Sequence, residues 1–124
     1  MLVMYVDGEA GKPISEQAPR AFNVLEAKLA SLKGRKFYGV VIGGLYRACV
    51  EIEPDDEPDL LAYPTWTLPG GRFARHRIAD WERHRDLIGP TFAALRARPD
   101  SDPNRPSIEF YRSQKELQVL VPVR

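Results

Sequence analysis

The sequence has a single cysteine, only two histidines and no long apolar run. Because Cys49 has no partner for an internal disulfide, we expect a cytoplasmic protein in which this residue is a small core side chain. His76 and His84 have no companion ligands at a zinc spacing, so neither a metal nor a cofactor is expected. No stretch approaches the roughly 18 apolar residues of a membrane span, and the start MLVMYVDGEAG lacks the pattern of a secretory signal.

An excess of one charge is also missing. The formal net charge is +1, with 28% charged and 44% hydrophobic residues, which is ordinary for a globular domain. A dedicated nucleic-acid binder usually has a concentrated basic excess. The basic run between Arg72 and Arg85 is interrupted by Asp80 and Glu82, so we interpret it as a solvated face.

The first half of the chain has the pattern of a strand, a helix and a hairpin. Residues 2–6 form a short apolar run that ends in a turn. Apolar side chains then recur at helical spacing from Phe22 to Leu32, with Ser15 as the expected cap and Gly34 as the expected stop. Two β-rich runs, RKFYGVVIG and LYRACVEIE, meet at a pair of glycines, which is typical of a β-hairpin.

The second half repeats this order. TWTLPGGRFARHRI predicts a short strand, a turn and another strand. A helix with an apolar stripe of Ile88, Phe92 and Leu95 follows; its regular part should begin near Pro90, after an irregular turn, and Pro99 should end it. PSIEFYRSQKELQVLVPVR then predicts a terminal hairpin. The shared order indicates a structural repeat, although the two sequences match weakly.

These elements predict an α+β fold in one domain, residues 1–124. The halves fall at about 1–53 and 65–124, joined by an acidic, proline-rich connector at 54–64. We expect the leading strands and hairpins to form one curved antiparallel sheet, with two helices on one face and a ligand cleft on the other. The acidic connector fits no calcium-loop spacing and is expected to be a solvated loop.

Glu109 stands out within the terminal hairpin. Strand alternation places it on the same face as Tyr111 and opposite the apolar Ile108 and Phe110. If the Ile108 face packs on the core, Glu109 faces either water or an enclosed site. A carboxylate enclosed among aromatic rings is costly unless a cation, a ligand or a proton compensates it.

Several segments resemble one known family. LPGGRFARHRI, FAALRAR, PSIEFY and LQVLVPV are similar to the second half of the GyrI-like small-molecule-binding domains, which also form the effector-binding part of several AraC-type and MerR-type bacterial regulators. GEAGKP, the helical segment and KFYGVV fit the first half. The resemblance covers nearly the whole chain. It implies a duplicated fold with a central cleft, faced by the glutamate of the E-x-Y strand, here Glu109 followed by Tyr111.

The function that the resemblance implies is a stand-alone protein that sequesters or senses lipophilic, aromatic or cationic xenobiotics. A carboxylate would supply the counter-charge, and aromatic walls would add cation–π attraction of about 0.5–2 kcal/mol. Alternation puts Phe37 and Tyr38 on opposite faces of their strand and leaves open which of them lines the cleft. The expected ligand-binding residues are Glu109, Tyr111, Tyr38, Phe37, Trp66 and Trp81.

Two alternatives remain open at this stage. Some stand-alone relatives hydrolyse reactive electrophiles such as cyclopropanoid natural products, which would make Glu109 the base and Tyr111 or Tyr38 its assistant. The third reading is a protein-interaction module without a ligand, in which exposed hairpin edges support a homodimer. No helix-turn-helix segment is recognisable, so direct nucleic-acid binding is not expected.

Overall fold

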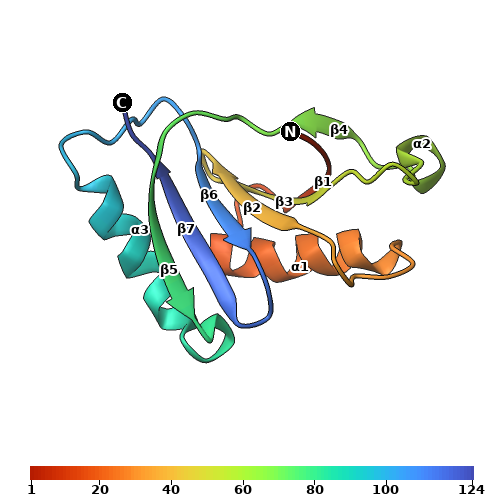
Figure 1. Ribbon diagram of the computed structural model, residues 1–124, viewed down its shortest axis with the longest axis horizontal. Helices are drawn as coiled ribbons and strands as arrows, with labels where there is room; N and C mark the ends of the chain where they lie inside the picture. Colours follow the sequence, from red (N-terminus) through yellow and green to blue (C-terminus); the bar gives the residue numbers. More distant parts are fainter. The chain divides into compact units, whose positions relative to one another are not determined.

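Helices and antiparallel strands make up the computed structural model of the chain (Figure 1), which confirms the α+β class. The structure describes residues 1–124 except for the side chain of Leu60. The chain divides into two units, which we call the first unit (Met1–Leu68) and the second unit (Pro69–Arg124).

The first unit contains four strands and two helices. Its strands pair antiparallel in the order β4-β1-β3-β2. The predicted hairpin is present, with Gly43 in the left-handed region at a φ of 60°. The elements are β1 (Leu2–Asp7), α1 (Ile14–Ala27), β2 (Phe37–Ile42), β3 (Leu45–Glu51), α2 (Pro58–Leu61) and β4 (Thr65–Thr67).

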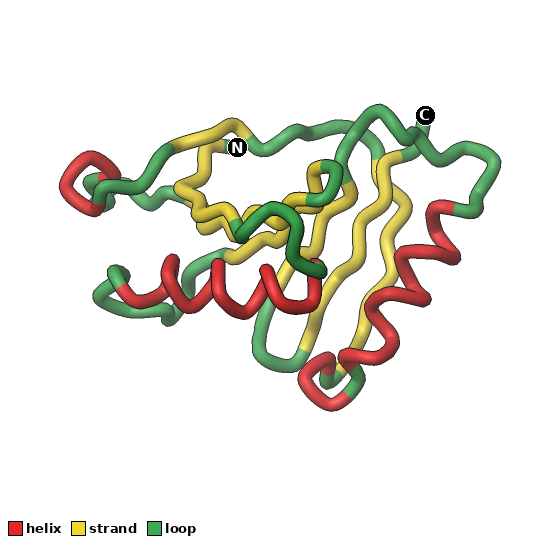
Figure 2. Tube along the Cα trace, turned by 180° about the vertical axis from the view of Figure 1, so that it is seen from behind, coloured by secondary structure: helices red, strands yellow, loops and turns green.

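The second unit contains three strands in the antiparallel order β6-β7-β5. Its helix runs alongside these strands (Figure 2). The elements are β5 (Phe73–Ala79), the 3₁₀ turns Trp81–Arg83 and Arg85–Leu87, α3 (Ile88–Arg96), β6 (Ser107–Tyr111) and β7 (Glu116–Pro122). The order strand, helix, hairpin therefore occurs in both units, as the sequence predicts.

The limits of α1 differ from the prediction at both ends. The helix is preceded by Pro13, and no side chain caps its first turn, so the expected role of Ser15 is wrong. It ends at Ala27, well before Gly34. The hydroxyl of Tyr63, from the connector, lies 2.8 Å from the carbonyl oxygens of both Val24 and Leu25. A tertiary contact thus satisfies carbonyl groups that the end of a helix leaves unpaired.

One face of the first-unit sheet packs against α1. Met4, Tyr46 and Val50 from the strands meet Ala21 and Leu25 from the helix in a buried cluster. The hydrophobic effect favours burying these side chains together, by about 1.5–3 kcal/mol for each large one.

Gln17 is a polar residue among the buried residues of α1, with 1% of its surface exposed. Its amide nitrogen donates to the carbonyl oxygens of Lys12 (2.7 Å) and Gly44 (2.8 Å), and its oxygen accepts from the backbone N–H of Tyr46 (2.9 Å). One side chain therefore connects α1 to the loop before it and to the β2–β3 hairpin.

The core of the second unit lies between α3 and two strands. Phe92 of α3 packs against Ile78 of β5 and against Val119 and Val121 of β7. The predicted stripe is confirmed, because Ile88 and Leu95 flank the same cluster. The cluster identifies the face of the β6-β7-β5 sheet that α3 covers.

The glycine-rich turn before β5 is organised by Arg105. Its guanidinium donates to the carbonyl oxygens of Gly70 (3.1 Å), Arg72 (3.0 Å) and Val123 (2.6 Å), and its Nε donates to Asp102 (3.2 Å). The turn therefore wraps around one arginine, which ties the start of β5 to the end of β7.

Replacing Gly71 with alanine should destabilise the protein by about 1–3 kcal/mol. Gly71 has a φ of +118°, and a Cβ there would collide with the Arg105 guanidinium. Gly70→Ala is the matched control, since nothing lies within 4 Å of a Cβ at that position and its φ is not positive. Urea unfolding of both variants measures the difference. Equal stability of the two would show that the turn does not need glycine at residue 71.

Candidate functional site

Three of the six residues expected to bind a ligand come together in the second unit. The Tyr111 hydroxyl donates to Glu109 Oε1 at 3.0 Å, and both side chains project from the same face of β6. The Trp81 ring meets the Tyr111 ring edge-on, with 5.0 Å between centroids. Only 7% of Glu109 is exposed. A buried carboxylate, a phenol and an indole are thus contiguous.

The structure corrects the face on which Glu109 lies. Glu109 is the cross-strand partner of Val119, which packs against Phe92 of α3. Glu109 therefore points to the helix-covered face rather than to the opposite one, where the sequence analysis placed the cleft. The α3 cluster draws its strand residues from β5 and β7, so Glu109 lies on β6 beside that cluster. Both faces of the hairpin are partly apolar, and the sequence pattern alone does not distinguish them.

The backbone around residue 80 positions Trp81. Asp80 adopts a left-handed conformation (φ 49°), and its N–H donates to the Lys115 carbonyl oxygen. The chain then enters the first 3₁₀ turn, and the indole N–H of Trp81 donates to the Ser113 carbonyl oxygen at 3.1 Å. Both bonds reach the β6–β7 turn, so they hold the indole beside Tyr111.

A cation from α3 reaches the same strand face two residues before Glu109. Arg96 Nε donates to Ser107 Oγ at 3.2 Å, and its guanidinium lies 4.9 Å from the centre of the Phe92 ring. Ser107 shares the Glu109 face by strand alternation. The sequence analysis did not identify Arg96, because only the packing of α3 brings this side chain to β6.

The other three expected residues lie in the first unit. Phe37 faces α1 and meets Phe22 edge-on at 6.2 Å. Tyr38 lies on the opposite face of β2, is 7% exposed and pairs across the strands with Cys49. Burial, and to a lesser degree the Glu51 carboxylate, raises the pKa of Tyr38 above its ordinary value of 10.0. The phenol therefore stays protonated at neutral pH and can serve as a hydrogen-bond donor.

Trp66, in β4, belongs to an aromatic stack that the sequence analysis missed. The Arg47 guanidinium lies 4.0 Å from the Tyr5 ring centre and 4.7 Å from that of Trp66, and it forms two bonds of 2.7 and 3.1 Å to Asp7. These residues come from β1, β3 and β4, so only the strand register shows that they meet. The stack holds the three-residue strand β4 against β1 and accounts for Trp66 without a ligand.

Cys49 is fully buried in this unit. Burial raises the pKa of its thiol to about 12, so the thiolate that a nucleophile requires is absent at neutral pH. Both histidines are exposed. Among the residues that the structure describes, no group of three or more His, Cys, Asp or Glu is placed to hold a metal ion.

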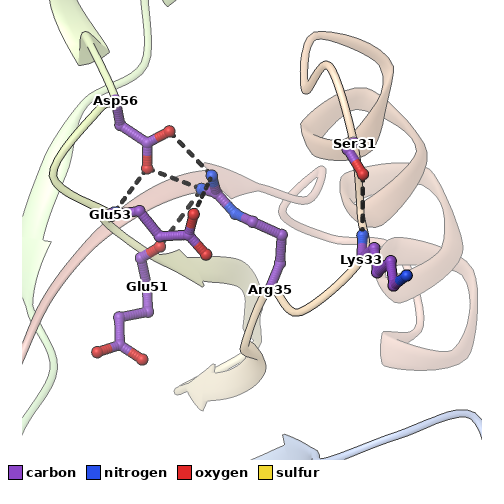
Figure 3. Close-up of polar contacts among 6 residues, drawn as sticks. All are labelled: Ser31, Lys33, Arg35, Glu51, Glu53 and Asp56. Carbon is purple, nitrogen blue, oxygen red and sulfur yellow. Dashed lines mark hydrogen bonds and ion pairs between the residues drawn. The ribbon is translucent and has the colours of Figure 1, made fainter.

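The acidic connector is anchored by Arg35 (Figure 3). The two terminal nitrogens of Arg35 each lie 2.9 Å from an oxygen of Asp56, and one also donates to the Glu51 carbonyl oxygen at 3.3 Å. Asp56 in turn accepts from the backbone N–H of Glu53 at 2.7 Å. The hydrogen bond from Arg35 is the main reason that the pKa of Asp56 lies below its ordinary value of 3.8. An internal arginine therefore supplies the cation for this carboxylate.

Asp56→Asn should destabilise the protein by about 2 kcal/mol, because it removes the closer of two carboxylates from a largely buried guanidinium. The side chains of Arg35 and Asp56 are 8% and 12% exposed. Glu53→Gln is the control, since Glu53 is 48% exposed and lies 3.6 Å from Arg35, and it should cost less than about 0.5 kcal/mol.

The same pair predicts a pH dependence. Because the pKa of Asp56 is lower in the folded state, its contribution is complete above the ordinary value of 3.8 and is lost as pH falls through the lower folded pKa. The stability difference between wild type and Asp56→Asn should therefore shrink in acid. Urea titrations at several pH values measure it, and a difference that is constant with pH would contradict this account.

Comparison with known proteins defines the fold. The chain has a TM-score of 0.70 to the integron cassette protein VCH_CASS2 from the mobile metagenome of Vibrio cholerae, at 15% identity over 98% of this chain and 91% of that one. It has a TM-score of 0.53 to SAV2435 bound to tetraphenylphosphonium, at 15% identity over 100% of this chain and 93% of that one. Neither a family model nor a curated protein matches the chain. At this identity the likeness establishes the fold alone.

The helices give one further result. Of those that the structure describes, none is both long and apolar enough to cross a membrane.

Proposed function

We propose that the protein is a GyrI-like module that binds small aromatic or lipophilic cations at a site containing Glu109, Tyr111 and Trp81. The observation that carries the proposal is the buried carboxylate of Glu109 beside the edge-on ring pair of Tyr111 and Trp81. The carboxylate provides charge, and the rings provide area and cation–π attraction of about 0.5–2 kcal/mol. Such walls tolerate many ligand shapes, since apolar burial depends on area rather than on directional bonds.

The comparisons support this choice of ligand class. SAV2435 has the same fold and was solved with tetraphenylphosphonium, a bulky aromatic cation. Tetraphenylphosphonium is therefore the first probe, and sequestration or sensing of such compounds is the proposed role. Of the three expected residues in the first unit, Trp66 contacts Arg47 and Phe37 packs against α1, so neither belongs to the proposed site. Tyr38 stays a proposed ligand contact of the first unit.

The test is a binding titration with a single tryptophan as the reporter. Trp66→Phe leaves Trp81 as the only indole, next to the proposed site. Tetraphenylphosphonium should quench its fluorescence and raise the melting temperature, while the neutral triphenylphosphine oxide should do neither at the same concentration. Equal responses to the cation and the neutral compound would show that the Glu109 carboxylate does not contribute to binding. No response to either would refute the proposal.

A second candidate, a hydrolase, is favoured by one observation. The Tyr111 hydroxyl donates to the Glu109 carboxylate, so a base and a phenol are already paired. Glu109 would take a proton from water as the water attacks an electrophilic carbon, and the phenol would stabilise the charge that develops on the leaving group. Mass spectrometry of a cyclopropane-containing electrophile after incubation tests this directly. Turnover that requires Glu109 would establish it.

A further inference from the structure

We infer that the outer edge of β5 is a docking site for an extended acidic peptide of a partner protein, which adds to the sheet as a further strand. This inference is independent of the proposed small-molecule site. Among the strands that the structure describes, β5 pairs with β7 on one side and is last in the strand order (Figure 1). Its sequence, FARHRIA, has three consecutive exposed basic or imidazole side chains, Arg75, His76 and Arg77.

Two backbone hydrogen bonds show which residues of β5 have N–H and C=O groups available to pair with a new strand. The Val123 N–H donates to the Arg72 carbonyl oxygen at 3.0 Å, and the Asp80 N–H donates to that of Lys115 at 2.6 Å. On the β5 side these bonds involve Arg72 and Asp80, which both have even numbers. In an antiparallel pair the hydrogen-bonded positions alternate, so the even-numbered residues of β5 are the ones bonded to β7. The N–H and C=O groups of Arg75 and Arg77 therefore point away from β7. These two residues present unpaired backbone groups at the edge.

The side chains of the same two residues lie on one face. Ile78 belongs to the α3 cluster, so even-numbered β5 side chains face α3 and odd-numbered ones face the other way. Arg77 is 57% exposed in its side chain. In a strand added antiparallel to β5, residues opposite Arg75 and Arg77 would be two apart, about 6.8 Å, and on the arginine face. Acidic residues at those two positions form favourable cross-strand pairs.

The excess of basic residues in the second unit favours an acidic partner. Residues 69–124 carry eleven Lys and Arg against seven Asp and Glu, whereas residues 1–68 carry seven against ten. On the arginine face, Glu116 lies 3.9 Å from Arg77 and 3.3 Å from Arg112. The Glu116 carboxylate repels a nucleic-acid backbone, which has a phosphate at every residue, more than it repels a peptide with a carboxylate at every second residue. Strand addition also uses the outward backbone groups, which a nucleic acid would leave unpaired.

A second copy of the chain fits this edge poorly. Two β5 strands paired antiparallel would bring arginines together. The acidic run of the chain, EPDDEPD at residues 53–59, has prolines at positions 54 and 58, which cannot donate to a ladder. The occupant is therefore a segment of another protein with acidic and β-forming residues in alternation.

A fluorescein-labelled octapeptide of alternating threonine and glutamate is the probe, and fluorescence polarisation is the measurement. Wild type should bind it, and the double variant Arg75→Glu/Arg77→Glu should bind at least about tenfold more weakly and gain affinity for the matching threonine–lysine peptide. Arg20→Glu/Arg83→Glu makes the same change in net charge elsewhere and should stay within about twofold of wild type. If the charge reversal prevents folding, Arg75→Gln/Arg77→Gln replaces it, with the same tenfold loss expected.

Four results would overturn the inference. Equal binding of a peptide with proline in place of threonine would show that charge alone, not strand addition, is responsible. Tighter binding of a labelled single-stranded oligonucleotide, lost in the same double variant, would assign the edge to nucleic acid. Failure of wild type to bind the peptide, or a homodimer that the double variant dissociates, would show that the arginines only protect the edge or serve a second copy.

Discussion

Replacing Glu109 with glutamine should weaken tetraphenylphosphonium binding about 100-fold, close to 2.7 kcal/mol. The substitution preserves the size of the side chain and its ability to accept from the Tyr111 hydroxyl, but it removes the negative charge. A cation that leaves water for a site with no counter-charge pays most of its desolvation cost without compensation. Isothermal titration calorimetry at neutral pH measures the change.

The matched control is Glu116→Gln in the same unit. Glu116 begins β7, and its carboxylate accepts from Gln118 and Arg112. Its removal changes the net charge by the same amount without touching the proposed site. Binding within about twofold of wild type is expected for this variant. A 100-fold loss in both variants would mean that overall charge, and not the position of Glu109, governs the affinity.

Tyr111→Phe separates binding from hydrolysis. It removes the hydroxyl that donates to Glu109 and keeps the ring that meets Trp81. A binding module should lose less than about tenfold in affinity, because the hydroxyl already donates to Glu109 without a ligand and the ring that would contact the cation is retained. In a hydrolase the same change should lower turnover far more than it raises KM.

The order of elements was predictable because it depends on local signals. The paired glycines between β2 and β3 and the alternation in β6 and β7 are properties of short segments. The limits of α1 were not predictable, since the Tyr63 hydroxyl that satisfies its terminal carbonyls comes from the connector. Likewise, α2 was absent from the prediction because it is a single turn in a proline-interrupted segment.

The candidate site also shows this difference between what local sequence signals predict and what tertiary contacts decide. Alternation correctly placed Glu109 and Tyr111 on one face of β6, and the hydrogen bond between them follows from that. Alternation does not say which face a helix covers, and the packing of Phe92 on Val119 decided this. Trp81 lies beside the pair because its indole N–H and the backbone N–H of Asp80 donate to carbonyl oxygens of the β6–β7 turn, which no local pattern indicates.

Replacing Gln17 with leucine should destabilise the protein by about 3 kcal/mol, although a leucine on the buried side of α1 matches the helical pattern better. Gln17 satisfies the buried N–H of Tyr46 and two backbone carbonyl oxygens. Leucine fills the space but leaves the N–H without a partner, and each buried unpaired polar group costs about 1–3 kcal/mol. Urea unfolding measures the loss. The control is Asn23→Leu, an exposed position on the same helix that should not lower stability.

Gln17→Glu tests whether hydrogen bonding, rather than volume, is responsible. A protonated carboxyl keeps the acceptor for the Tyr46 N–H and one of the two donor bonds, whereas the ionised form loses both donor bonds and buries a charge. Burial raises the pKa of such a carboxyl in the folded state. Its stability relative to wild type should therefore be highest below the ordinary value of about 4.3 and fall as pH rises through the folded pKa. Gln17→Leu has no titrating group and should show the same deficit at every pH. If the glutamate variant were equally destabilised at pH 4 and pH 7, filling of the site would matter and its hydrogen bonds would not.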